Sequence, residues 1–167
     1  MSDRSFIARF RELHDKVRAG NLPAALQPKY ERARRELARL MLVAQQMNHG
    51  GHTLREAFRI AQLVKVELDL GGPAPEKTST MDLATGGFAA LLSGRQPIGK
   101  RVTYTLHLPA SAAGAEQLKG AATVASSRSQ GGLWRVSFSF DNPAPAEKEQ
   151  LEMAIIDFIL RRFPAPT

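Results

Sequence analysis

The chain of 167 residues contains no cysteine. Without thiols it has no disulfide, no thiolate nucleophile and no cysteine-ligated zinc or iron–sulfur cluster. No uninterrupted apolar run approaches the roughly 18 residues that span a bilayer. The first residues alternate charged and apolar side chains and lack the apolar stretch of a secretory signal peptide. We therefore expect a cytoplasmic protein that does not insert into membranes.

Patterns typical of enzymes are also missing. The sequence has no Gly-x-Ser-x-Gly nucleophile motif and no Gly-x-x-x-x-Gly-Lys phosphate loop. Nothing in the spacing of the four histidines selects a metal site, and no pair of carboxylates stands out for acid–base chemistry. We expect neither catalytic residues nor a bound metal, and the protein is predicted not to be an enzyme.

Basic side chains are concentrated in the first third of the chain. The whole sequence has a net charge of +7, and residues 1–60 hold 12 of the 23 basic side chains but only six of the 16 acidic ones. The remaining residues are nearly neutral. Any electrostatic attraction to a polyanion therefore has to begin in the N-terminal third.

Two helices are predicted in this basic region. Apolar residues recur at helical spacing and predict a first helix over residues 3–18. A second helix, over residues 28–47, has an apolar seam of nearly three heptads, which is typical of a coiled coil or a helical hairpin. The seam consists of Tyr30, Ala33, Leu37, Leu40, Ala44 and Met47. We predict a helical region over residues 1–51.

From Ile60 onward the hydrophobic period changes to the alternation of β-strands. Closely spaced short strands separated by loops rich in glycine and proline favour a small antiparallel barrel. The predicted strands are residues 61–70, 78–83, 87–92, 100–108, 118–127 and 133–140, and residues 147–162 return to a helical period. The expected fold is α+β, with a six-stranded antiparallel β-barrel and C-terminal helix over residues 52–167, after an N-terminal helical hairpin.

Two short motifs in the second region contain residues that bind anions and bases. Arg55 and Arg59 are spaced so that two guanidinium groups can converge on one phosphate. Asp82 precedes Gly86 and Gly87, and a carboxylate can accept the N–H donors of a guanine edge while glycines allow close backbone approach. Taken separately, the first motif is common on helix surfaces and the second is an ordinary turn between strands.

In this order, the two motifs resemble the signature of the PilZ domain, a bacterial family that binds cyclic di-GMP. That signature is Arg-x-x-x-Arg before the first barrel strand, followed by Asp/Asn-x-Ser-x-x-Gly. Here Arg55-x-x-x-Arg59 is followed, 23 positions after its second arginine, by Asp82-Leu83-Ala84-Thr85-Gly86-Gly87. The resemblance covers about residues 52–163 and includes the closing strand and the terminal helix.

The resemblance implies a role for each matching residue. Arg55 and Arg59 would hold phosphates and stack on or hydrogen-bond a guanine. Asp82 would bind a guanine edge, and Gly86 and Gly87 would let the backbone approach the ligand. Cyclic di-GMP would be the ligand, and no cofactor is implied.

One position departs from the family pattern, because Ala84 stands where the family has serine. The change removes a hydroxyl that could hydrogen-bond the nucleotide. Loss of one neutral hydrogen bond costs about 0.5–1.5 kcal/mol, which is at most about tenfold in affinity. We expect weakened binding rather than none.

The resemblance leads us to expect a receptor that reorients its N-terminal helices on binding cyclic di-GMP and signals through a downstream protein. The sequence does not identify that partner. One alternative is a PilZ-fold interaction or oligomerisation module that no longer binds nucleotide, in view of Ala84. Another is nucleic-acid binding by the basic helices, which the interspersed glutamates disfavour.

The apolar seam of the second helix also has to be covered. It can pack within the chain, or the helices over residues 3–18 and 28–47 can form a homo-oligomer. The sequence leaves both arrangements open.

Overall fold

The computed structural model describes residues 3–48, 60–111 and 114–163. The chain divides into two compact units. The helical unit comprises Met1–Phe58 and Ile159–Thr167, and the barrel unit comprises Arg59–Phe158. The predicted division at residue 51 lies outside the described residues.

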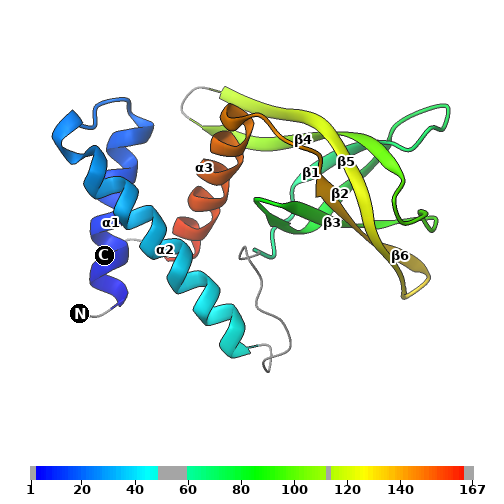
Figure 1. Cartoon of the computed structure of the whole chain (residues 1–167), viewed down its shortest axis with the longest axis horizontal. Coiled ribbons are helices and arrows are strands. Elements are labelled where there is room, and N and C mark those ends of the chain that lie inside the picture. Colours follow the sequence, from blue (N-terminus) through cyan, green and yellow to red (C-terminus); the bar gives the residue numbers. More distant parts are fainter. Residues whose placement is uncertain (1–2, 49–59, 112–113, 164–167) are drawn as a thin grey trace. The chain divides into compact units, whose positions relative to one another are not determined.

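The N-terminal helical hairpin is confirmed. Helix α1 (Asp3–Arg18) is joined to α2 (Gln27–Asn48) through a short 3-10 turn, η1 (Ala24–Leu26) (Figure 1). Phe10 and His14 of α1 stack against Tyr30 of α2, and all three are buried. The Nδ1 of His14 and the hydroxyl of Tyr30 lie 2.8 Å apart, so this buried polar pair is hydrogen-bonded.

Burial along the α2 seam decreases toward the end of the helix. Tyr30 and Leu37 are buried, Leu40 is half-buried and Ala44 is exposed, whereas the side chain of Met47 lies outside the described residues. The reason is length, because α1 has 16 residues and α2 has 22. At 1.5 Å per residue, α1 is about 24 Å long and α2 about 33 Å.

The last helix, α3 (Pro145–Arg162), crosses the boundary between the two units. Within the helical unit, the guanidinium of Arg11 donates to the carbonyl oxygens of Leu160, at 2.6 Å, and Phe163. The Leu160 carbonyl also accepts a hydrogen bond from the N–H of Phe163, at 3.2 Å. An arginine at this position thus helps to cap the end of α3. None of the described helices is long and apolar enough to cross a membrane.

Six antiparallel strands form a closed barrel, as predicted, in the order β1-β2-β3-β6-β5-β4 (Figure 1). Every pair of neighbours in this order is antiparallel. The strands are β1 (Lys65–Asp69), β2 (Glu76–Ala84), β3 (Gly87–Leu92), β4 (Arg101–Ser111), β5 (Gly114–Gln130) and β6 (Leu133–Phe140).

The first strand begins later than its alternating pattern predicted, at Lys65 rather than at residue 61. The hydroxyl of Thr80 accepts from the backbone N–H of Val64, at 3.0 Å, and donates to the carbonyl of Gln62, at 2.6 Å. A side chain therefore replaces part of the backbone ladder over these residues, although the alternation of burial continues.

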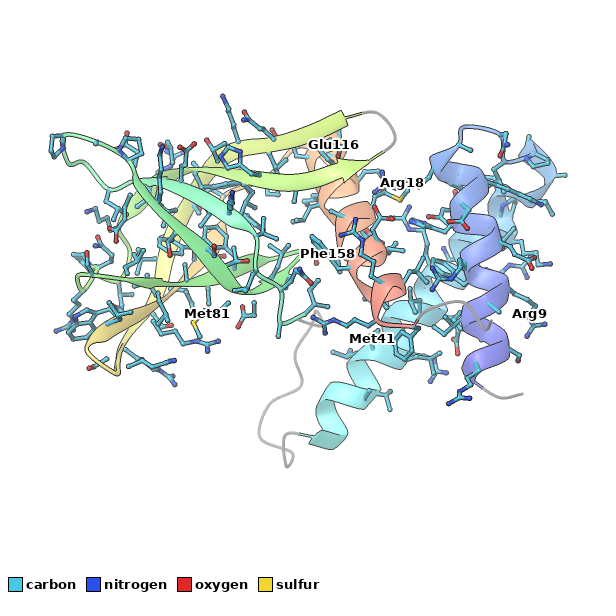
Figure 2. The ribbon with its side chains drawn as sticks, turned by 180° about the vertical axis from the view of Figure 1, so that it is seen from behind. Arg9, Arg18, Met41, Met81, Glu116 and Phe158 are labelled. Atoms are coloured by element: carbon cyan, nitrogen blue, oxygen red, sulfur yellow. The ribbon has the colours of Figure 1, made fainter. Side chains whose placement is uncertain are left out.

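Aromatic residues fill the barrel interior. Phe88 of β3 stacks on Phe138 of β6, with ring centroids 5.0 Å apart, and Tyr104 of β4 and Phe140 complete the cluster. Tyr104 lies against Gly120 on β5, where an added Cβ would be 2.8 Å from the tyrosine hydroxyl. Figure 2 shows Glu116, near the start of β5, beside α3, and its carboxylate accepts a hydrogen bond from Gln150 at 3.4 Å.

Candidate functional site

The motif from Asp82 to Gly87 forms the β2–β3 hairpin. Ala84 ends β2 and pairs with Gly87, the first residue of β3, so Thr85 and Gly86 make a two-residue turn. The carbonyl of Gly86 accepts a hydrogen bond from the N–H of Phe140, at 3.0 Å, which ties the turn to the end of β6.

A β-bulge between Thr80 and Asp82 determines which way the motif points. Thr80 is fully buried, and strict alternation from it would turn Asp82 into the barrel. The extra residue, Met81, shifts the register by one, so Leu83 is the next fully buried side chain. Asp82 and Ala84 therefore lie on the outer face of the barrel.

The carboxylate of Asp82 forms an ion pair on this outer face. Its Oδ2 accepts a hydrogen bond from Nη2 of Arg135, on β6, at 2.6 Å. The Asp82 side chain is 15% exposed and that of Arg135 36%. The site thus contains a carboxylate that accepts N–H donors and a guanidinium that can bind an anion.

Arg135 was not among the residues that the sequence singled out. Alternation in β6 places it on the outer face, because Val136 and Phe138 are buried in the interior. Its contact with Asp82 depends on the strand order β2-β3-β6, in which β2 and β6 are both neighbours of β3. No sequence spacing indicates that order.

Small side chains lie beside Asp82. Ala84, at 5% exposure, and Ala89, which is fully buried, both lie on the outer side of their strands. Ala89 is opposite Asp82 on one side and Ser137 on the other. Ala84 therefore occupies a buried position, where a serine hydroxyl would need a hydrogen-bonding partner.

The two glycines of the motif differ in what they contact. A Cβ on Gly87 would lie 2.0 Å from the carbonyl oxygen of Phe138, so the close pairing of β3 with β6 requires glycine there. A Cβ on Gly86 would meet nothing within 4 Å. Neither glycine has a positive φ. A role for either in ligand approach stays a prediction.

Arg55 and Arg59 lie outside the described residues. The next residue, Ile60, is paired with Leu83 by two backbone hydrogen bonds of 2.9 Å in an isolated antiparallel bridge. Leu83 stands between Asp82 and Ala84. The chain is therefore anchored beside the second motif at the residue that follows the first.

Over the described ranges, no group of three or more histidine, aspartate or glutamate side chains is arranged to hold a metal ion. Among the residues that the structure describes here, one carboxylate and one guanidinium form an ion pair. Such a pair is suited to binding polar, anionic molecules rather than to coordinating a cation.

Comparison with known protein families identifies the barrel. The family model described as "PilZ domain" matches residues 53–157, well over half of the chain. This chain belongs to the PilZ domain family. The family and the barrel fold predicted from the sequence are thus both confirmed. No curated protein matches the sequence.

Solved structures of PilZ proteins are similar to this chain. The PilZ domain of YcgR from Escherichia coli, with c-di-GMP, has 25% identity and a TM-score of 0.51, covering 66% of this chain and 94% of that one. Escherichia coli YcgR in complex with c-di-GMP has 26% identity and a TM-score of 0.51, covering 65% and 46%.

The Bacillus subtilis inhibitor of motility, MotI/DgrA, has the same fold at lower sequence similarity. Its identity is 16% and its TM-score 0.55, and the match covers 67% of this chain. This PilZ chain spans about half the length of MotI/DgrA, 52%.

Proposed function

We propose that this PilZ chain is a receptor for cyclic di-GMP, bound on the outer face of the barrel at the β2–β3 hairpin. The backbone bridge between Ile60 and Leu83 carries the proposal. It anchors the residue after Arg59 opposite the residue after Asp82, although the two motifs lie more than 20 positions apart in the sequence.

The chemistry of Asp82 suits a guanine. The Watson–Crick edge of guanine presents two adjacent N–H donors, and a carboxylate presents two acceptor oxygens. The two phosphates of cyclic di-GMP require cationic partners, which Arg55 and Arg59 supply in this proposal. Two YcgR structures of 25% and 26% identity contain c-di-GMP, which supports the same ligand here.

The proposed signal passes through residues 49–59, which join the helical unit to the barrel unit. Drawing Arg55 and Arg59 onto a dianionic ligand changes this segment, and the α1–α2 hairpin is reoriented as a result. A downstream protein then recognises the new arrangement. Amide hydrogen exchange over residues 48–60 should slow at saturating ligand, and unchanged exchange contradicts the switch.

Self-association through α1 and α2 is part of this proposal. The apolar seam of α2 is buried at Tyr30 and Leu37 but exposed at Ala44, which leaves room for a second copy of the chain. Light scattering at high micromolar concentration should give a mass above that of the monomer. A monomer mass would contradict self-association and leave nucleotide binding untouched.

The second candidate function is a PilZ-fold interaction module without a nucleotide. The observation that favours it is Ala84, which lacks the serine hydroxyl and is buried on the outer face. Calorimetry with micromolar cyclic di-GMP distinguishes the two functions. Binding should be measurable and should weaken about 10- to 150-fold in Asp82→Ala and in Arg59→Ala, because each variant loses a hydrogen bond to a charged group.

If calorimetry detects no heat of binding between the wild-type protein and cyclic di-GMP, the receptor proposal is contradicted and the interaction module is favoured. A random DNA duplex titrated at two salt concentrations tests the nucleic-acid alternative, because phosphate contacts by the basic helices would make binding fall steeply with salt.

A further inference from the structure

Arg135 faces two charges of opposite sign on the outer face of the barrel. Its direct cross-strand neighbour on β5 is Arg128, which is exposed. On its other side, beyond β3, lies the carboxylate of Asp82, at 2.6 Å from Nη2. Like charges in directly opposed positions repel each other. The ion pair with Asp82 offsets this repulsion and directs the guanidinium of Arg135 toward β2.

The pairing register of β2, β3 and β6 explains how Arg135 reaches Asp82, which lies two strands away. Asp82, Ala89 and Ser137 form one row across β2, β3 and β6, and Arg135 is two residues before Ser137 on β6. The contact thus runs diagonally over β3, between strands about 10 Å apart. Ala89 lies between the two charged side chains, and its single methyl group leaves them room to meet.

The contact constrains Asp82 through a single hydrogen bond to one of its oxygens. One nitrogen of Arg135, Nη2, donates to one oxygen of Asp82, Oδ2. A carboxylate has two oxygens with about four lone-pair directions, and this bond occupies one of those directions. A charge-assisted hydrogen bond at a largely buried carboxylate also holds its plane in one orientation.

We propose that Arg135 is a specificity-determining positioning residue of the nucleotide site, which orients the Asp82 carboxylate for both donors of guanine. The inference rests on the proposed function, cyclic di-GMP binding, and adds a residue outside the two sequence motifs. It acts through Asp82 and requires no contact between Arg135 and the ligand.

The test compares ligands that differ only in the donors of the base. Cyclic di-GMP offers N1–H and the exocyclic amino group, whereas cyclic di-IMP lacks the amino group. The wild-type protein should prefer cyclic di-GMP by at least about tenfold, the value of one hydrogen bond to a charged group. In Arg135→Ala the ratio of the two dissociation constants should fall below about threefold, and Arg135→Lys should be intermediate.

Arg128→Ala is the matched control, because it removes the same charge from the directly opposite position on β5. It should leave the ratio within about twofold of the wild-type ratio. In an Asp82→Ala background, Arg135→Ala should change the ratio no further, because the residue acts only through Asp82.

The outcomes separate the inference from the proposed function. If the wild-type protein binds cyclic di-GMP but Arg135→Ala weakens both nucleotides equally, Arg135 contributes charge or stability only, and the inference is overturned. The inference is also overturned if the ratio of the two dissociation constants falls as far in Arg128→Ala as in Arg135→Ala. If the wild-type protein binds neither nucleotide, the proposed function fails and the inference fails with it.

Discussion

The inner and outer faces of β2, β3 and β6 are built from alternate residues of the same three strands, yet they differ in almost every respect. The inner face has Leu83, Phe88 and Phe138, all buried and apolar. The outer face has Asp82 and Arg135, which are charged and partly exposed, beside small residues such as Ala89.

The inner face stabilises the fold, whereas the outer face carries the proposed binding site. Buried aromatic residues stabilise the barrel through area removed from water and through ring contacts. An ion pair at the protein surface contributes little to folding, about 0–1 kcal/mol, and the guanidinium side of this pair is 36% exposed. Substitutions on the inner face should therefore unfold the barrel, whereas substitutions on the outer face should change ligand binding at nearly constant stability.

The largest effect is expected for Phe88→Ala on the inner face. Phe88 contacts the rings of Tyr104, Phe138 and Phe140, and truncating it leaves a cavity in the interior. The free energy of unfolding should fall by about 3–5 kcal/mol, measured by urea denaturation. Ser139→Ala, an exposed position on β6, should change it by less than about 0.5 kcal/mol. Equal losses of unfolding free energy in the two variants would contradict the distinction between the faces.

Gly87→Ala tests whether the contact between β3 and β6 is as close as the structure indicates. The new Cβ would overlap the Phe138 carbonyl oxygen, so the two strands must separate. We expect a loss of about 3 kcal/mol, at the upper end for overpacking. Gly86→Ala, one residue earlier in open space, should be almost neutral in thermal unfolding. A stable Gly87→Ala protein would refute the close pairing.

Alkaline pH probes Tyr104, a buried residue of the inner face, when the wild type is compared with a variant that lacks its hydroxyl. Burial, with the carboxylates of Glu147 and Asp141, raises the pKa of Tyr104 to about 12 from its ordinary value of 10. The folded state therefore favours the neutral phenol. This preference costs no stability below about pH 10, where the phenol is neutral in both states, and stability falls as pH rises from about 10 through about 12.

Denaturation midpoints of the wild type and Tyr104→Phe should therefore converge or cross as pH rises over that window. The phenylalanine variant cannot ionise at this position, so the difference between the two proteins isolates Tyr104. A constant difference between them up to about pH 12 would contradict burial of the phenol.

The smallest effect is expected for Ala84→Ser on the outer face. The added hydroxyl restores the residue of the family pattern and can form one neutral hydrogen bond to the nucleotide, worth about 0.5–1.5 kcal/mol. Calorimetry should show affinity for cyclic di-GMP rising by up to about tenfold. Weaker binding in Ala84→Ser than in the wild type would mean that the hydroxyl is buried without a partner.

Much of the fold could be predicted because the relevant signals are local. Alternation over residues 133–140 predicted β6 with its observed bounds, and the short apolar stretch between loops at residues 87–92 did the same for β3. The change from helical to alternating period near Ile60 separated the helices from the barrel. The order and spacing of the two motifs indicated the PilZ family. The match of the family model to residues 53–157 then confirmed it.

The remainder depends on interactions between distant segments. Local alternation alone would turn the Asp82 carboxylate into the barrel. The β-bulge at Met81 places it on the outer face instead. Gly87 looks like a turn residue in the sequence, but its carbonyl contact lies on β6. Thr80 replaces part of the β1 ladder through its hydroxyl, which shortens a strand that alternation had extended.

The sequence by itself determined the elements, the barrel class and the candidate carboxylate, because hydrophobic period and motif spacing are properties of neighbouring residues. Only the tertiary structure decided that Arg135 meets Asp82, 53 positions away. Closure of the barrel places β2 and β6 on either side of β3, and register then selects one guanidinium among the many basic residues of the chain. Strand order determines which charged side chains come into contact, and local sequence patterns do not predict strand order.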